Sequence, residues 1–341
     1  MKKVFLSILA VAALASCVED LGYDNPISFG APFVGNTTKA AADPSYGDPA
    51  KDAVALKKFN VYGTVQGTGA GVVNIFKGVE VTGEVGGDWG YKTEYNQYWI
   101  PGAKYNFAAV VDAEVETDGN GMPAKLTTVA HGNDAAAPYV KSFLKDMLYD
   151  KADEIASASA NQAAVNFAFE HLLAKAQFVV TSNTEGGYYY NVKNIKIHNY
   201  AKGTYTIDGE TWSDLTPVAY SLGDILNVTK VNTNQTNATQ VLLIPTTADF
   251  NVEFVVELRN DMGTTDNVND DALLREIHYT ATALPADSKA EKMDPITVST
   301  GLVKGHAYNF NLNLTAGSLI EFTVTKNPTW FDPSDNVNLG L

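Results

Sequence analysis

The sequence contains a single cysteine, Cys17, and only two arginines, Arg259 and Arg275. Without a second cysteine the chain can form no internal disulfide. Its formal net charge is -15, and no basic patch with interleaved aromatic residues occurs. Such a surface repels nucleic acid and anionic lipid headgroups, so we expect neither as a partner.

Sequence patterns for catalysis and metal binding are also missing. The five histidines (His131, His171, His198, His278 and His306) show no metal-ligand spacing, and no Gly-x-Ser-x-Gly elbow occurs. The glycine-rich residues 67–71 lack the spacing of a dinucleotide site and indicate a hairpin turn. His171 ends a predicted strand and is expected to be structural. We expect no metal, no cofactor and no enzymatic activity. Of the three classes of function that we consider, an enzyme is therefore the least favoured.

The N-terminus carries a secretion signal. Lys2 and Lys3 precede an apolar run over residues 4–15, which is too short to span a bilayer as a mature helix. Leu14-Ala15-Ser16-Cys17 resembles a bacterial lipobox, so residues 1–16 are the expected signal peptide and Cys17 the expected lipid attachment site. The alternative is an ordinary signal peptide with an incidental cysteine. Two or three acyl chains would hold the mature protein firmly at a membrane. The acidic residues Glu19 and Asp20 after Cys17 resemble the export signal of Bacteroidetes surface lipoproteins, which implies the outer membrane.

Period-two alternation of apolar residues dominates the rest of the chain. Alternation of this kind indicates strands with one buried face, and the turn residues between them suit antiparallel sandwiches. We therefore predict an all-β fold. The segments with this alternation cover residues 59–65, 105–111, 165–169, 250–256, 308–314 and 320–324.

The length of the mature chain favours two domains, residues 17–161 and 162–341. Residues 150–162 are small, polar and rich in alanine, so we place the boundary there. Residues 139–148 show helical spacing of apolar side chains, which indicates a helix or a short connector. We expect Phe167, Phe254, Phe310 and Phe322 in the second core.

Two features leave binding roles open. The oxygen-rich residues 260–271 can be a calcium loop or a solvated hairpin, but they lack EF-hand spacing. Tyr188, Tyr189 and Tyr190 and the four tryptophans can form a sugar platform or belong to the core. A surface glycan-binding lipoprotein is therefore the alternative function.

Several segments, in order along the chain, resemble the fimbrillins of Bacteroidetes, the subunits of lipoprotein-derived pili. The opening strand and its threonine-basic-alanine loop lie in residues 26–40, and the histidine-leucine-leucine segment that begins the second domain lies in residues 169–175. The other matching segments are residues 59–63, 97–107, 194–197 and 321–324.

The resemblance implies two transthyretin-like antiparallel β-sandwich domains in tandem and a structural subunit that supports adhesion. Assembly would use strand exchange after a protease removes the first strand, residues 27–33, with Ile27, Phe29 and Phe33 as the exchanged side chains. Lys39 is the basic residue that matches the family's cleavage position, which elsewhere is an arginine. The partners implied are other pilus subunits, the outer membrane through the lipid, and a host or bacterial receptor. Residues 319–325 and 336–341 are the candidate donor strands.

Overall fold

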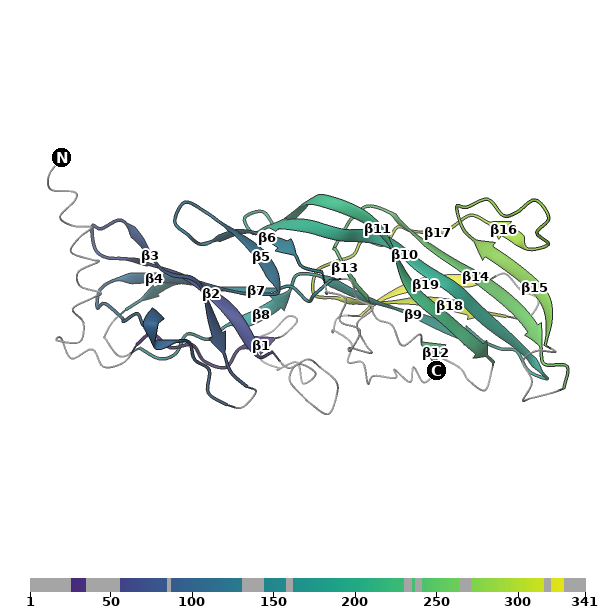
Figure 1. Cartoon of the computed structure of the whole chain (residues 1–341), viewed down its shortest axis with the longest axis horizontal. Coiled ribbons are helices and arrows are strands. Elements are labelled where there is room, and N and C mark those ends of the chain that lie inside the picture. The colour runs from purple at the N-terminus through teal and green to yellow at the C-terminus, as the bar shows by residue number, and fades with distance from the viewer. Residues whose placement is uncertain are drawn as a thin grey trace.

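A computed structural model describes residues 26–34, 56–84, 87–130, 144–157, 162–229, 235–236, 241–263, 271–315 and 320–327. The molecule is elongated, with β3 and β4 near one end and β15 near the other (Figure 1). In these ranges the regular structure is strand apart from a 3-10 helix at Thr93–Tyr95. The predicted all-β fold is confirmed.

A six-stranded sheet forms the first part of the molecule, in the order β1-β8-β7-β4-β2-β3. The alternation in β2 places Phe59, Val61 and Val65 on its buried face, as predicted. Gly63 lies in this strand because a β carbon there would come within 2.8 Å of the Phe107 ring. The strands are β1 (Phe33–Val34), β2 (Lys58–Gln66), β3 (Val72–Thr82), β4 (Lys104–Val111), β7 (Leu148–Ala156) and β8 (Ala168–His171).

Extended segments cover the buried face of this sheet. Residues 26–30 lie among them, joined by an antiparallel bridge from Pro26 to Tyr98 and a parallel bridge from Phe29 to Val165. Trp99, Val165 and Phe167 complete the cover and belong to the same core as the sheet. The first core therefore depends on pieces of chain from three distant parts of the sequence.

Two sheets face each other across the second core. The eight-stranded sheet has the order β16-β15-β14-β10-β6-β5, with β11 on β10 and β17 on β14, and the five-stranded sheet has the order β12-β9-β18-β19, with β13 on β9. Phe178 and Phe310 of the smaller sheet pack with Val192 and Phe254 of the larger one. The larger sheet contains β5 (Ala113–Thr117), β6 (Pro123–Thr128), β10 (Tyr188–Thr206), β11 (Thr211–Val228), β14 (Phe250–Asn260), β15 (Ala272–Tyr279), β16 (Glu291–Met293) and β17 (Ile296–Val298). The smaller sheet contains β9 (Ala174–Ser182), β12 (Gln235–Thr236), β13 (Val241–Leu243), β18 (Ala307–Leu314) and β19 (Glu321–Asn327).

Most strand pairs are antiparallel, but β1 with β8, β9 with β18, and β15 with β16 are parallel among the described strands. Side-chain alternation is the same for both directions, so the sequence pattern could not separate them. Phe254 and Phe310 are buried in the second core and Phe322 is half-buried against it, as predicted.

The β5–β6 hairpin joins the two parts of the molecule. Although it comes from the first half of the chain, it pairs with the end of β10, with Leu126 opposite Tyr205 (Figure 1). A third apolar cluster lies beneath it and combines Val110 and Leu172 with Ile244. The hairpin and this third cluster thus connect the two parts of the molecule.

Two predictions about the middle of the chain need correction, those for Phe167 and for the helix. Phe167 lies in the first core, packed with Phe29 and Phe59, and not in the second core. In the region of the predicted domain boundary, residues 150–156 belong to β7, which pairs with β4. The expected helix does not extend over Leu144 and Leu148, because Leu144 forms a β-bridge to Ala130 and Leu148 begins β7. The start of the predicted helical segment, residues 139–143, lies outside the described residues. The division at residue 161 stays a prediction, but the packing of β8 favours a later point.

Candidate functional site

The N-terminal segment, residues 26–30, lies at the centre of the first core. Its alternation is complete: Ile27 is 0% exposed and Phe29 3% exposed, whereas Ser28 between them is exposed. Both apolar side chains therefore enter the same row of contacts, as the two-residue spacing predicts. Val34, at the end of β1, is also buried in this core.

Backbone hydrogen bonds hold the segment on both sides. The Ile27 N–H donates to the Gln97 carbonyl (2.7 Å), and the Tyr91 hydroxyl donates to the Ile27 carbonyl (2.5 Å). On the other side the Val165 N–H donates to the Ser28 carbonyl (2.9 Å) and the Gly30 N–H donates to the Val165 carbonyl (3.0 Å). The segment is thus an inner strand of the cover, and its loss would leave polar backbone groups on both neighbours without partners.

The Phe29 ring occupies a pocket made of other aromatic rings. Its centroid lies 5.4 Å from Phe76, 5.7 Å from Tyr91, and 5.9 Å from both Phe107 and Phe167. Rings at these separations pack favourably, beyond the gain from burial alone. Without Phe29 the pocket would be an apolar hollow at the heart of the first core.

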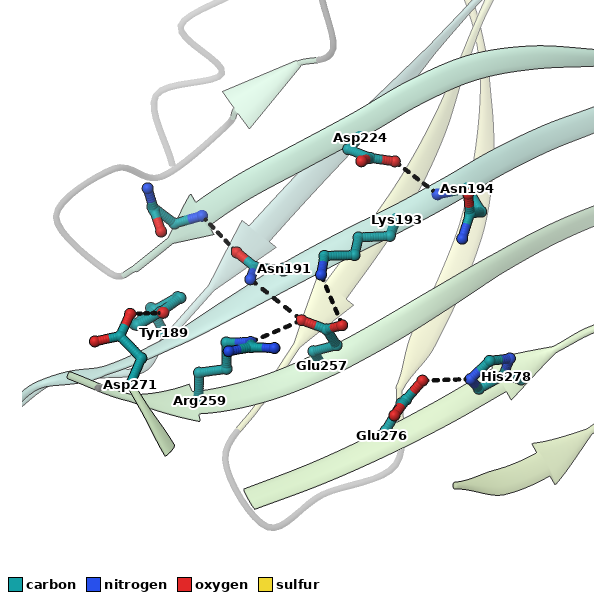
Figure 2. Close-up of polar contacts among 11 residues, drawn as sticks. Tyr189, Asn191, Lys193, Asn194, Asp224, Glu257, Arg259, Asp271, Glu276 and His278 are labelled. Atoms are coloured by element: carbon teal, nitrogen blue, oxygen red, sulfur yellow. Dashed lines mark hydrogen bonds and ion pairs between the residues drawn. The ribbon is translucent and has the colours of Figure 1, made fainter. Parts of the chain in front are cut away.

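A second group of polar side chains lies on the outer face of the larger sheet. Val256 and Leu258 in β14 pack toward the second core. Because side chains alternate along a strand, Glu257 and Arg259 lie on the opposite, outer face of the sheet. Figure 2 shows Glu257 between Lys193, Asn191 and Arg259. Its carboxylate accepts hydrogen bonds from Lys193 (2.8 Å), Arg259 (2.7 Å) and Asn191 (3.3 Å).

Burial of the Glu257 carboxylate disfavours its charged form, but the three donors outweigh this and hold its pKa below the usual value. Nearby, the Tyr189 hydroxyl donates a hydrogen bond to the Asp271 carboxylate (Figure 2). Burial, and to a smaller extent the Asp271 carboxylate, raises the pKa of Tyr189 to about 12. The acceptors and donors of the cluster satisfy one another. The cluster is therefore suited to fixing the strands in register, not to binding a ligand.

A family model described as fimbrillin-like matches residues 50–328 of the chain. The chain belongs to the fimbrillin-like family. A fimbrial protein from Bacteroides vulgatus is similar in fold, with a TM-score of 0.60 and 14% identity over 89% of this chain and 99% of the other. None of the curated proteins matches this sequence.

Two other solved structures are similar at lower scores. A candidate cell adhesion protein from Bacteroides ovatus is 14% identical over 89% of this chain and 96% of its own, with a TM-score of 0.47. A fimbrial assembly protein from Parabacteroides distasonis is 13% identical over 89% of this chain and 100% of its own, with a TM-score of 0.36.

The predicted site residues of this fimbrillin-like chain are placed unequally. Ile27 and Phe29 are brought together in the first core, and the backbone of Phe33 in β1 pairs with that of Ala168 in β8. Cys17 and Lys39 lie outside the described residues. The residues that hold the segment, Tyr91, Gln97 and Val165, were not predicted from the sequence. No local sequence pattern indicates that these residues contact an N-terminal strand.

The two candidate donor strands of the fimbrillin-like chain also differ. Most of residues 319–325 form β19, which pairs with β18, and Ile320, Phe322 and Val324 pack against the second core. Residues 336–341 lie outside the described residues. The first candidate thus already has a structural place in its own subunit.

Most of the described aromatic residues that suggested sugar binding serve the fold of this fimbrillin-like chain, whereas Tyr188 is exposed. Trp99 and Tyr190 are buried, Trp89 stacks on Phe59, and Trp212 packs on Tyr205. In the oxygen-rich loop, Asn260 and Asp261 side chains accept backbone N–H groups of their own turn. No cluster of three or more metal-ligating side chains occurs among the residues that were searched, which are the described ones.

Two further findings concern the fimbrillin-like chain as a whole. His171 is 1% exposed and its Nδ1 lies 2.8 Å from Asp146, as expected for a structural histidine. Over the described ranges, no helix is long and apolar enough to cross a membrane.

Proposed function

We propose that this fimbrillin-like chain is a structural subunit of a surface pilus that supports adhesion. It is exported as a lipoprotein anchored through Cys17 and is assembled by donor-strand exchange. Removal of the N-terminal strand by a cut at or near Lys39 precedes the exchange. Its role is structural and not enzymatic, and its partners are other pilus subunits and a receptor on a host or bacterial surface.

The burial of Ile27 and Phe29 in the first core carries this proposal. Lys39 lies in the sequence between Val34, where β1 ends, and Leu56, where the described chain resumes. A cut there would separate residues 26–34 from the rest of the first core, and it would fall outside all the strands that the structure describes. The vacated place would offer both an apolar pocket and unpaired backbone groups, which is what strand addition requires.

Cleavage is necessary for exchange on energetic grounds. One strand that replaces another makes about the same backbone hydrogen bonds, so the exchange gains little free energy from them. While residues 26–34 remain covalently attached, the local concentration of the native strand stays high and an incoming strand competes poorly. After the cut, the native segment can leave, and the lipid leaves with it.

The proposal is tested with the unlipidated Cys17→Ser chain in which the residues around Lys39 are replaced by a site for a sequence-specific protease. We expect the uncut protein to stay monomeric in size-exclusion chromatography with light scattering. After cleavage, ladders of ordered oligomers should appear, and deletion of the donor segment should abolish them. A cleaved protein that stays monomeric, or an uncut protein that polymerises equally well, would contradict strand exchange and favour a fixed anchor or a glycan-binding role.

A further inference from the structure

A hollow of about 600 Å³ opens along the edge of the first sheet. One wall is β3, which is the edge strand of the described sheet and lies near one end of the molecule (Figure 1). The other wall is the chain from Gly90 to Tyr95, which leaves β3 after two backbone hydrogen bonds between Gly90 and Thr82 (2.8 and 2.9 Å). Sites for small ligands typically have volumes of roughly 300–1,000 Å³, so the hollow has a suitable size.

Tyr91 and Tyr95 give the hollow two aromatic walls. The Tyr91 ring is held against Phe76 of β3, with centroids 5.5 Å apart. Tyr95 ends the 3-10 helix and is 43% exposed, so its ring is open to a ligand. A tyrosine presents an apolar ring face and a polar tip. This combination suits a sugar ring, whose C–H groups form an apolar face and whose hydroxyls form a polar rim.

Two lysines give the hollow a positive charge. Lys77 of β3 and Lys92 of the opposite wall are both exposed, and neither forms an ion pair in the described part of the chain. Glu80, the acidic residue among those that line the hollow, is paired with Lys58 of β2 (2.9 Å). The chain has 39 Asp and Glu residues against 24 Lys and Arg residues, so this local excess is opposite to its overall charge. Charge complementarity therefore favours an anionic ligand.

The edge of β3 is poorly suited to the addition of a peptide strand. Its register with β2 shifts twice, at Ile75 and at Gly78, and Gly78 has a φ of 74°. Bulges of this kind twist an edge away from regular pairing and leave backbone groups unpaired. Gly78 and Thr82 both line the hollow, so they offer hydrogen bonds to a compact polar ligand instead of a regular ladder to a strand.

We propose that this hollow binds an acidic sugar, a pyranose ring that carries a carboxylate, as part of a surface glycan. The ring packs on Tyr95 and Tyr91, and its carboxylate lies between Lys77 and Lys92. A neutral sugar would leave the lysines unused, and a small inorganic anion would leave the tyrosine rings uncovered. The inference rests on the adhesive role in the proposed function and names the chemistry of the receptor, whereas strand exchange is not needed for it.

The test uses the uncut, unlipidated Cys17→Ser chain, which needs no assembly to fill its first core. Sialyllactose and trigalacturonic acid are the acidic probes, and lactose and the methyl ester of trigalacturonic acid are their neutral counterparts. Each probe is titrated by saturation-transfer NMR. We expect at least one acidic probe to bind, and its neutral counterpart to bind roughly fivefold more weakly or less. Added salt should weaken the binding of the acidic probe, because the lysines are exposed.

Variants with matched controls locate the site. Lys77→Gln and Lys92→Gln should each weaken binding of the acidic probe by roughly fivefold, whereas Lys104→Gln, at an exposed lysine elsewhere on the first sheet, should not. Tyr95→Ala should also weaken it by roughly fivefold. Tyr188→Ala is the control, because Tyr188 is equally exposed (43%) but lies in the other part of the molecule. Circular dichroism and thermal melting confirm that each variant is folded.

Several results would overturn the inference. If neither acidic probe binds, or if both bind no better than their neutral counterparts, the hollow is not a site for an acidic sugar. If binding is lost with Tyr188→Ala or Lys104→Gln and not with Tyr95→Ala or Lys77→Gln, the sugar binds elsewhere. These outcomes are distinct from a failure of the proposed function. A cleaved chain that forms oligomers but binds no sugar still acts as a pilus subunit, and a chain that binds sugar but forms no oligomers contradicts strand exchange alone.

Discussion

The ring of Phe29 stacks on the ring of Phe167, with centroids 5.9 Å apart and an interplanar angle of 22°. One ring comes from the N-terminal segment and the other from the chain just before β8. Their contact joins the segment proposed to be exchanged to a part of the chain that stays in the subunit. The first core is thus incomplete without a residue in the place of Phe29.

Phe29→Ala should destabilise the first core by about 3–5 kcal/mol, because it removes a fully buried ring from an aromatic pocket. Ser28→Ala, at the exposed neighbouring position, should change the free energy of unfolding by less than about 0.5 kcal/mol. Urea denaturation of the uncut chain measures both. Equal losses for the two variants would show that the segment is not held by its buried side chains.

Phe254→Ala should cost about 3–5 kcal/mol of unfolding free energy, since Phe254 is 1% exposed in the second core. Phe322 is half-buried on the edge strand β19, so Phe322→Ala should cost less. The same denaturation experiment compares them. A loss well under 1 kcal/mol for Phe254→Ala would contradict its burial.

Glu257→Gln should destabilise the protein at neutral pH by about 1–3 kcal/mol, because it weakens the charged hydrogen bonds from Lys193 and Arg259. The lowered pKa of Glu257 means that its contribution is complete above the unfolded value of about 4.3 and is lost as the pH falls through its folded pKa. The difference between the variant and the natural chain should therefore shrink in acid. As a control, Glu80→Gln removes an exposed pair with Lys58 and should have little effect. A difference that stays constant down to low pH would contradict the charged role of Glu257.

Cys17→Ala should leave the protein without lipid and off the outer membrane, because the thiol is the predicted attachment point. Fractionation of cells labelled with radioactive palmitate measures both effects. Normal membrane retention of the variant, with label still incorporated, would contradict the lipobox assignment.

The sequence predicted the strands well because their alternation is strong. Phe59, Tyr105, Phe254 and Phe310 all face a core as expected, since a period-two pattern identifies a buried face whatever the neighbouring strand is. The core to which a strand belongs does not follow from alternation. Phe167 is an example. It directly precedes β8, and β8 pairs with β1 and β7 of the first sheet and not with the later strands of the second core.

The candidate site was predictable only in part. Ile27 and Phe29 could be singled out by their spacing and by the family resemblance. The residues that receive them could not, since Tyr91, Gln97 and Val165 meet the segment only through long-range packing. The close approach of Gly30 to the Asn166 side chain is also a contact between distant segments, and no local pattern marks it.

The N-terminal residue of the subunit in isolated surface filaments tests the central claim most directly. N-terminal sequencing or mass spectrometry of purified filaments provides the measurement. Strand exchange after cleavage predicts that the subunit begins at or near Ala40, with Ile27 and Phe29 gone. Filament subunits that still begin at an acylated Cys17 and retain residues 26–34 would contradict it.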